Sequence, residues 1–417
     1  VPPEPPALNL ISMKPVLLLL FTLLGNRFVL AQTAPDWPVV GQLKTRDAKE
    51  IKASTWSIGG ETLDRDYTDY QSWKTYLGPL GAKRIRLQGG WAKTEKVKGQ
   101  YDFAWLDAVI PDAASRGVSP WVEFSYGNAI YEGGGEARLH SPLPNTSEAL
   151  QAWDNWVRAM VNRYKEHVSD WAVWNEPDVS KSYTSEDYAL FFIRTAKVVR
   201  SLQPNARLLA VSLSRLDRPE WVNGFYNVLQ RENALDLVGQ FVYHGYAAPY
   251  GWAYNPDDVY PQLETIRQLV WRYDPKVVFM QGECGAPSTP NPEVGVFKDL
   301  NWSELTQAKW DLRRMLGDHG RGIQTSLFGI SDMRYVSAEL NGVNSKGILL
   351  TNPDKTIARP KLIYYAAQRI FSLFDDQIQL DPNLLISSDG VNQSHFGYRT
   401  AAGAPLLTFW QTEYPPY

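Results

Sequence analysis

The sequence predicts an α/β fold, a (β/α)8 TIM barrel that carries a small β-strand appendage near its C-terminal end. After residue 50, short apolar runs alternate with amphipathic stretches, as in chains of parallel β/α units. Connections from a helix to the next strand are short, whereas those from a strand to the next helix are long. A barrel shows this asymmetry because its functional loops follow the C-terminal ends of the strands.

The expected strands are short runs rich in apolar, β-branched and aromatic residues. They cover residues 56–60, 84–88, 120–125, 170–175, 207–212, 238–244, 277–283 and 325–330. An open doubly wound sheet is the alternative architecture. It is disfavoured because no Gly-x-Gly-x-x-Gly turn follows the first strand, as a dinucleotide-binding fold would need.

Apolar residues at helical spacing predict helices between these strands. Asn145 and Glu148 are expected to cap the helix over residues 150–164. A second amphipathic stretch follows Thr184, and Pro360 is expected in the first turn of the last helix. These helices supply the outer layer that a barrel requires.

The first residues have the pattern of a secretory signal peptide. Met13 and Lys14 are followed by an apolar run over residues 16–24 and by a small-residue cleavage site at 29–31. The run is too short for a membrane-spanning helix, which needs about twenty apolar residues. We therefore expect residues 1–31 to be a signal peptide with an upstream segment, and the protein to be secreted or periplasmic.

The remaining chain divides into two expected parts. Residues 45–375 carry the strand and helix pattern of the barrel. Residues 376–417 form the appendage, with expected strands over 384–388, 395–398 and 405–410. We expect the appendage to be truncated, because it ends directly after a strand-like run.

Charge and composition disfavour several classes of function. The net charge of −3 gives no reason to expect nucleic acid or a membrane surface as a partner. The single cysteine allows no internal disulfide, and the 5 histidines lack the spacing of a metal site. We therefore expect neither a metal nor a cofactor, and the sequence leaves the oligomeric state open.

Two glutamates stand where chemistry at a barrel mouth would need them. Glu176 belongs to the string Trp-Asn-Glu-Pro after the fourth strand, and Glu283 ends the seventh strand. Both would face the C-terminal rim, where a separation of about 5–5.5 Å suits cleavage of a glycosidic bond by double displacement. Glu176 would be the acid/base, which must hold a proton near neutral pH, and Glu283 would be the ionised nucleophile.

These motifs resemble those of the clan A retaining glycoside hydrolases. Within the clan, the strings Gly-Gln-Tyr-Asp-Phe at 99–103 and Trp-Leu-Asp at 105–107 are similar to the family-39 type, the β-xylosidase and α-L-iduronidase relatives. The resemblance covers roughly residues 50–375. It implies a glycosidase (an O-glycosyl hydrolase) with a retaining mechanism, in which Glu176 is the acid/base and Glu283 the nucleophile.

Neighbouring residues match substrate-binding roles of the clan. The resemblance implies that Asn175 bonds the sugar 2-OH and that His244 and Tyr246 line the subsite beside the nucleophile. Arg86, in the second strand, could donate to the nucleophile and keep it ionised. Arg84 lies on the same strand face and competes with Arg86 for that contact.

One aromatic residue that the clan uses is absent. Many clan members place a tryptophan at the end of the eighth strand, under the sugar, whereas residues 327–332 contain none. Trp91 or Tyr126 could serve as the sugar-stacking platform instead. Glu123 is an unusual charge within the third strand, and we expect it to form a buried ion pair with an arginine.

The sequence therefore predicts a retaining glycosidase that cleaves β-type (equatorial) bonds of an oligo- or polysaccharide substrate, in polysaccharide degradation. Family-39 relatives favour exo action, and the loops after the third and eighth strands could close one end of the cleft. The former loop contains a triglycine run at 133–135 that we expect to be flexible. The alternatives are an endo-β-glycanase with an open groove, or a catalytically silent carbohydrate-binding barrel.

Overall fold

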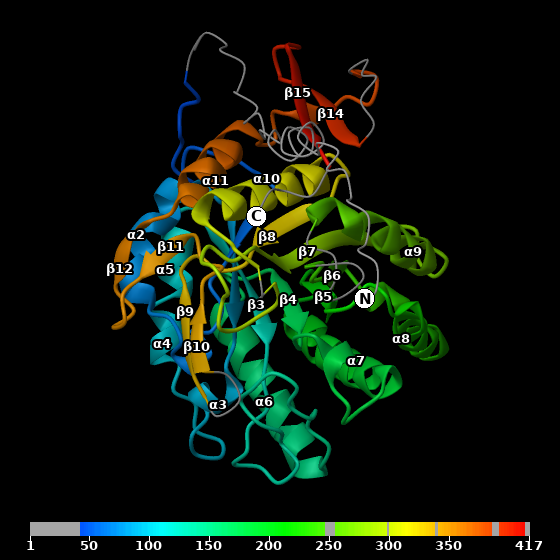
Figure 1. Cartoon of the computed structure of the whole chain (residues 1–417). Coiled ribbons are helices and arrows are strands. Elements are labelled where there is room, and N and C mark those ends of the chain that lie inside the picture. The colour runs from blue at the N-terminus through cyan, green and yellow to red at the C-terminus, as the bar shows by residue number, and fades with distance from the viewer. Residues whose placement is uncertain (1–41, 247–254, 298–299, 338–340, 386–391, 413–417) are drawn as a thin grey trace, which may run out of the picture. The chain divides into compact units, whose positions relative to one another are not determined.

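Eight parallel strands close into a barrel in the computed structural model, which confirms the predicted fold class (Figure 1). Each strand pairs with the next one in the sequence, and β8 pairs back onto β1. The strands are β1 (Trp56–Gly59), β2 (Arg84–Gln88), β3 (Ser119–Phe124), β4 (Asp170–Val173), β5 (Arg207–Leu213), β6 (Gln240–Tyr243), β7 (Val278–Cys284) and β8 (Gln324–Leu327). Every predicted barrel strand is present, with its ends shifted by a few residues.

The structure describes most of the chain, namely residues 42–246, 255–297, 300–337, 341–385 and 392–412. The described residues from 44 onward belong to one compact unit. The predicted signal segment at 1–31 lies outside the described residues, so export stays a prediction. Within the described ranges, no helix combines the length and the apolar character that crossing a membrane requires.

Helices form the outer layer of the barrel (Figure 1). They are α2 (Tyr70–Leu80), α3 (Trp91–Thr94), α4 (Ala104–Asp107), α5 (Ile110–Ser115), α6 (Ser147–Tyr164), α7 (Ser185–Leu202), α8 (Pro219–Arg231), α9 (Tyr260–Trp271), α10 (Glu304–His319) and α11 (Leu362–Leu373). Short 3-10 turns occur at η1 (Leu63–Arg65), η2 (Pro177–Val179), η3 (Leu235–Leu237) and η4 (Pro256–Val259). The helices bury one apolar face, as α6 does with Trp153, Trp156 and Val157.

Of two predicted helix starts, one is present in the structure and one is shifted. The helix α7 begins directly after Thr184, which forms a capping box with Asp187, as the amphipathic pattern indicates. The expected cap at Asn145 is wrong, because the N-cap of α6 is Thr146, whose hydroxyl accepts a hydrogen bond from a backbone amide of the first turn. The backbone N–H of Asn145 instead donates to the carbonyl oxygen of Gly133, within the preceding loop.

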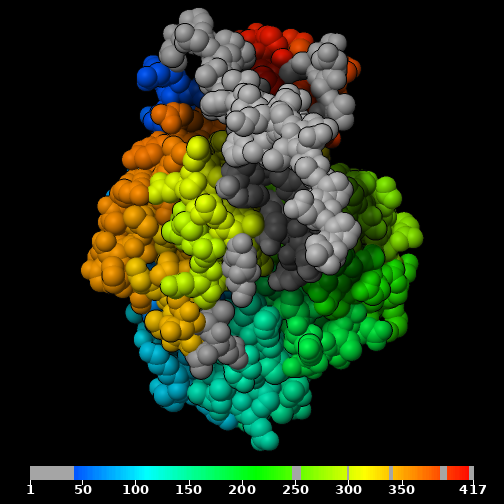
Figure 2. Space-filling view, viewed as in Figure 1, coloured from blue at the N-terminus to red at the C-terminus, as the bar shows by residue number. Residues whose placement is uncertain are grey.

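The long connection from β8 to α11 contains short strands of its own. β9 (Met333–Val336) pairs with β10 (Asn341–Asn344), and β11 (Leu349–Thr351) pairs with β12 (Ile357–Pro360). Pro360 is therefore the last residue of a strand, and its predicted place in the first turn of α11 is wrong. A proline is tolerated there because β12 is paired on one side only. The space-filling view shows this region in yellow to orange on the left (Figure 2).

The predicted appendage forms a small antiparallel sheet. Its strands are β13 (Gln379–Leu380), β14 (Gln393–Arg399) and β15 (Pro405–Gln411). The strands expected over 395–398 and 405–410 are thus present. Of the strand expected over 384–388, the first two residues have no strand pairing and the others lie outside the described residues. Trp410 Nε1 donates to Asp257 Oδ1 (3.1 Å), which joins the sheet to the segment before α9.

The barrel interior changes from apolar to charged toward the C-terminal ends of the strands. An apolar cluster fills the interior, made of Trp121, Ala172, Leu209, Val242 and Met280. Alternate residues of a strand share one face, so Glu123 follows Trp121 on the inner face of β3, and Arg86 lies on the inner face of β2. The strands therefore present charged groups at the rim, above a packed apolar layer.

Candidate active site

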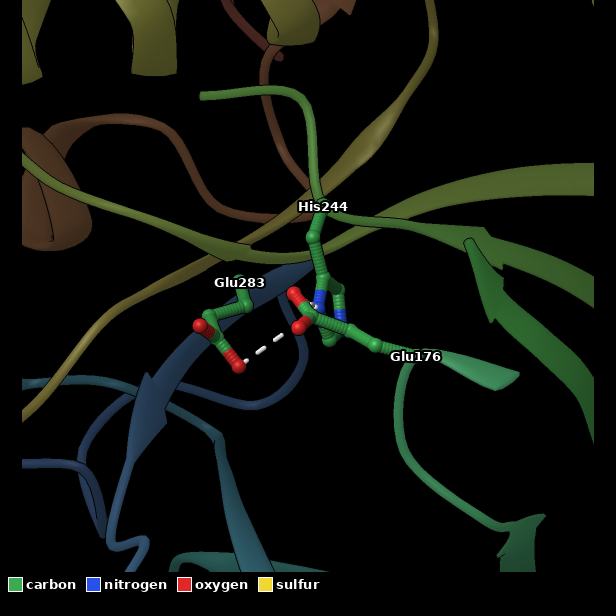
Figure 3. Close-up of side chains that lie close together, drawn as sticks. All are labelled: Glu176, His244 and Glu283. Atoms are coloured by element: carbon green, nitrogen blue, oxygen red, sulfur yellow. Dashed lines mark hydrogen bonds and ion pairs between the residues drawn. The ribbon is translucent and has the colours of Figure 1, made fainter. Parts of the chain in front are cut away.

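Glu176 and Glu283 face each other at the C-terminal ends of β4 and β7 (Figure 3). Glu176 follows β4 in a left-handed backbone conformation (φ 47°), which is uncommon for residues other than glycine and often marks functional sites. Oxygens of the two carboxyl groups lie within 4.8 Å of one another. The side chains are largely buried, with 13% and 12% of their areas exposed. Folding thus brings together the two glutamates that the sequence singled out.

Arg86 holds one side of this pair in place. Its Nη1 donates to Glu283 Oε2 (2.5 Å), and its Nη2 donates to Asn175 Oδ1 (2.6 Å). The same guanidinium reaches Glu123 Oε2 (2.7 Å) and Glu61 Oε1 (3.3 Å). The expected buried ion pair of Glu123 is therefore confirmed. Because the guanidinium is completely buried, these charge-assisted bonds form without competition from bulk water.

Arg84, the competing candidate, has a different partner. It pairs with Asp170 at the beginning of β4, at the other end of the barrel from the glutamates. Two arginines on one strand face therefore serve opposite ends of the barrel. Of these two arginines, Arg86 is the one that contacts Glu283.

The surroundings of Glu283 favour its ionised form. Burial by itself would raise the pKa of this carboxyl group. The charges of His244 and Arg86 and the hydrogen bond from the Tyr246 hydroxyl (2.7 Å) outweigh burial and lower the pKa of Glu283 below its ordinary value. An ionised carboxylate that points into a pocket is suited to act as a nucleophile.

His244 connects the two carboxyl groups. Its Nδ1 lies 2.9 Å from Glu176 Oε1 and 3.5 Å from Glu283 Oε2, and the ring is completely buried. Two carboxyl groups and an imidazole are donor types that could hold a divalent cation. The Arg86 guanidinium already neutralises Glu283, and the imidazole already bonds Glu176. We therefore interpret the group as an acid/base (Glu176) and a nucleophile (Glu283) with their positioning residues rather than as metal ligands.

The glutamate pair opens into a pocket of about 300 Å³. Its lining residues come from the segments that follow β3 to β8, all on the same rim of the barrel. They are Leu139, His140, Glu176, Val179, Ser214, Tyr246, Glu283, Gly295, Val296, Phe328, Tyr335, Asn344 and Lys346. This arrangement agrees with a site built at the C-terminal face of a barrel.

The two predicted platform residues do not offer a ring to this pocket. Trp91 is completely buried, and its ring stacks with the rings of Tyr131 and Trp156, the latter from α6. Tyr126 is 2% exposed, and the Arg65 guanidinium lies over its ring at 4.9 Å. Neither ring has a free face for a sugar, so the stacking role expected for both is not supported by their positions.

The triglycine run at 133–135 forms a closely packed turn, and its flexibility stays a prediction. A Cβ added at Gly134 would lie 2.3 Å from the Asn128 carbonyl oxygen, and one at Gly135 would lie 2.4 Å from the Pro142 carbonyl oxygen. Only glycine allows backbones to approach this closely. The packing fixes the course of the connection that brings two residues to the pocket.

Several residues that line the pocket were not predicted from the sequence. Phe328 directly follows β8, at the place where the clan carries a tryptophan, so a search for any aromatic there would have found it. Tyr335 and Lys346 come from the long β8–α11 connection, whose path no local pattern reveals. His140 likewise comes from a loop.

A closed (β/α)8 barrel with a buried glutamate pair at the ends of its fourth and seventh strands agrees with the arrangement expected of a retaining glycosidase. The model of glycosyl hydrolases family 39 matches residues 81–297, slightly more than half of the chain. The matched region contains both glutamates. The chain therefore belongs to this family, as the motifs indicated.

Solved structures show the same fold. The chain is 21% identical to a family 39 glycoside hydrolase from the gut symbiont Bacteroides cellulosilyticus WH2, with a TM-score of 0.65, over 89% of this chain and 73% of that one. It is 18% identical to a monomeric β-xylosidase from Caulobacter crescentus CB15, with a TM-score of 0.57, over 82% and 73% of the two chains. Among curated proteins, the β-galactosidase BgaA of Clostridium cellulovorans is 28% identical, in a match that covers 28% of this chain and 21% of that protein. The match therefore spans about a fifth of that relative's length.

Proposed function

We propose that this chain is a retaining, exo-acting glycosidase that cleaves equatorial (β-type) glycosidic bonds. One observation carries the proposal: oxygens of Glu176 and Glu283 lie within 4.8 Å of one another. Retaining enzymes hold their two carboxyl groups about 5–5.5 Å apart, whereas inverting enzymes need about 6.5–9.5 Å to admit a water molecule between them. The short separation supports double displacement.

In the first step, a carboxylate oxygen of Glu283 attacks the anomeric carbon while the bond from that carbon to the leaving oxygen breaks. Glu176 gives its proton to the leaving oxygen. The products are a neutral glycosyl ester on Glu283, an ionised Glu176 and the released alcohol. In the second step Glu176 takes a proton from water, whose oxygen attacks the anomeric carbon and frees the Glu283 carboxylate.

The neighbouring residues have supporting roles in these steps. Arg86 and Tyr246 each bond one oxygen of Glu283 and keep it ionised before attack. Arg86 also fixes the Asn175 side-chain oxygen, which leaves the Asn175 amide nitrogen to donate to the sugar 2-OH. His244 holds the Glu176 carboxyl group toward the pocket.

The shape of the site supports action at a chain end. Segments after β3, β7 and β8 all contribute walls to the pocket. A volume of about 300 Å³ lies at the lower end of the range for small-molecule sites and suits a terminal sugar better than a continuous chain. The Phe328 ring, beside Tyr246, replaces the absent tryptophan as an aromatic wall.

A panel of aryl β-glycosides, followed by proton NMR of the first anomer released, tests the proposal. We expect hydrolysis of at least one of these glycosides, with release of the β-anomer. Release of the α-anomer would refute double displacement. Failure to cleave any aryl glycoside, together with cleavage inside longer chains, would favour an endo-β-glycanase, and binding without any turnover would favour a carbohydrate-binding barrel.

A further inference from the structure

A buried ammonium group, that of Lys346, lies in the wall of the pocket and has no anionic partner among the described residues. Lys346 is 2% exposed, and its Nζ donates to the Val296 carbonyl oxygen (2.9 Å). The ring centroid of Tyr246, whose hydroxyl bonds the nucleophile, lies 5.9 Å from this nitrogen. No carboxylate of the described ranges forms an ion pair with Lys346. Two of the three ammonium hydrogens are therefore available for a ligand in the pocket.

The fold clamps the backbone on both sides of Lys346. The buried Lys361 donates to the carbonyl oxygens of Ser345 (3.1 Å) and Gly347 (2.8 Å), the residues that flank Lys346. The Gln307 amide donates to the carbonyl oxygen of Lys346 itself (3.1 Å). The long β8–α11 connection therefore has one defined course where it passes the pocket.

Space for the ammonium group is also provided. Gly295 has φ +90°, and a Cβ added there would lie 2.7 Å from Lys346 Nζ. Any other residue at position 295 would displace the ammonium group from its place. The glycine at position 295, in the segment after β7, thus leaves room for the ammonium group of Lys346.

Keeping Lys346 charged in this buried position costs free energy when no ligand is bound. Burial lowers the pKa of Lys346 to about 7, although the negative charges of Glu283 and Asp311 oppose that shift. A desolvated ammonium group that has one carbonyl partner among the described residues gains most from an anionic oxygen, because charge-assisted hydrogen bonds are roughly twice as strong as neutral ones. A sugar hydroxyl would leave the charge uncompensated.

We propose that Lys346 is a specificity-determining residue that binds the carboxylate of a uronic acid residue seated against Glu283. This inference rests on the proposed function and names the sugar class that the same pocket selects. A carboxylate attached at C5 is held a few ångströms from the anomeric carbon by the sugar ring. It can therefore pair with a cation in the pocket wall without displacing the nucleophile. A free anion would lack this constraint and would be repelled by the two glutamates.

Matched pairs of aryl glycosides test the inference, namely a β-glucuronide against a β-glucoside and a β-galacturonide against a β-galactoside. The two members of each pair differ only in the group attached to C5, which is a carboxylate in the uronide and a hydroxymethyl group in the neutral glycoside. We expect kcat/KM to be higher for a uronide than for its neutral partner in the native enzyme. Lys346→Met should reduce this ratio by about tenfold to a hundredfold, the value of a hydrogen bond between charged groups. Lys309→Met, on the exposed face of α10, is the control and should leave the ratio unchanged.

The pH dependence of KM provides a second readout. The ammonium group loses its proton as the pH rises through about 7, so KM for the uronide should increase above that pH. This increase should be absent in Lys346→Met. Preference of the native enzyme for the neutral glycosides, or equal losses on both members of a pair in Lys346→Met, would overturn the inference and leave the proposed glycosidase function intact. Hydrolysis of neither class, in any linkage, would contradict the proposed function itself.

Discussion

Replacing Tyr246 by phenylalanine removes one hydrogen bond from the nucleophile and little else. The hydroxyl donates to Glu283 Oε1, and the ring packs edge-on against Phe297 and Phe328. Phenylalanine keeps these ring contacts, so we expect the variant to fold. The substitution therefore isolates the contribution of one O–H group to the ionisation of Glu283.

The size of the effect follows from the contact. A hydrogen bond to a charged group contributes about 1.5–3 kcal/mol, and one pKa unit corresponds to about 1.4 kcal/mol. Tyr246→Phe should therefore raise the pKa of Glu283 and lower kcat/KM on the acidic side by about tenfold to a hundredfold. Since Glu283 must be ionised to attack, the acidic limb of the kcat/KM profile should move to higher pH. The alkaline limb, which reports on the proton donor, should stay in place.

The assay is the pH profile of kcat/KM on an activated aryl glycoside. Tyr226→Phe is the matched control, because the Tyr226 hydroxyl is buried and has no hydrogen-bond partner among the described residues. We expect the control to reproduce the native profile. An unchanged acidic limb in Tyr246→Phe, or an equal shift in the control, would refute the role assigned to this hydroxyl.

The remaining predictions concern the two glutamates and one buried ion pair. Glu176→Ala should slow the cleavage of glycosides with poor leaving groups far more than that of activated aryl glycosides, and added azide should restore the rate; an equal loss on all leaving groups would contradict an acid role. Glu283→Ala should abolish turnover even of activated substrates, and substantial residual activity with retention would place the nucleophile elsewhere. Lys361→Met should lower the free energy of unfolding by about 3–5 kcal/mol in denaturant titrations, because Asp332, 2.6 Å from the ammonium group, would be left buried and unpaired. A loss below about 1 kcal/mol, or no recovery of stability on adding Asp332→Asn, would show that this pair does not stabilise the fold.

Local patterns in the sequence were sufficient for the barrel and for the central pair. Each barrel strand is a short apolar run between turns, so its position could be read from neighbouring residues alone. Glu176 and Glu283 could be paired because parallel strands of a barrel present their C-terminal ends on one rim. The contact between Arg86 and Glu283 follows from the same rule.

Residues placed by long connections could not be predicted in this way. Trp91 was expected at the pocket but is buried elsewhere, whereas Lys346 was not expected there but lines it. The sequence predicts a sugar-stacking role for Trp91, but Trp153 and Trp156 of α6 pack against its indole, a contact that depends on how the helix packs. Lys346 carries no motif, and it reaches the pocket only because Lys361 and Gln307 fix the backbone around it. Loop geometry of this kind depends on tertiary contacts rather than on local propensity.

The most direct test of the central claim is to trap the covalent intermediate. A 2-deoxy-2-fluoro aryl glycoside of the sugar that the enzyme cleaves should inactivate the protein with a mass increase of one glycosyl unit. Peptide mass spectrometry should then locate the sugar on Glu283, and the Tyr226→Phe control should label at the same position. A label on any other carboxylate would contradict the assignment of Glu283, and turnover with inversion of configuration and no label would contradict double displacement at this glutamate pair.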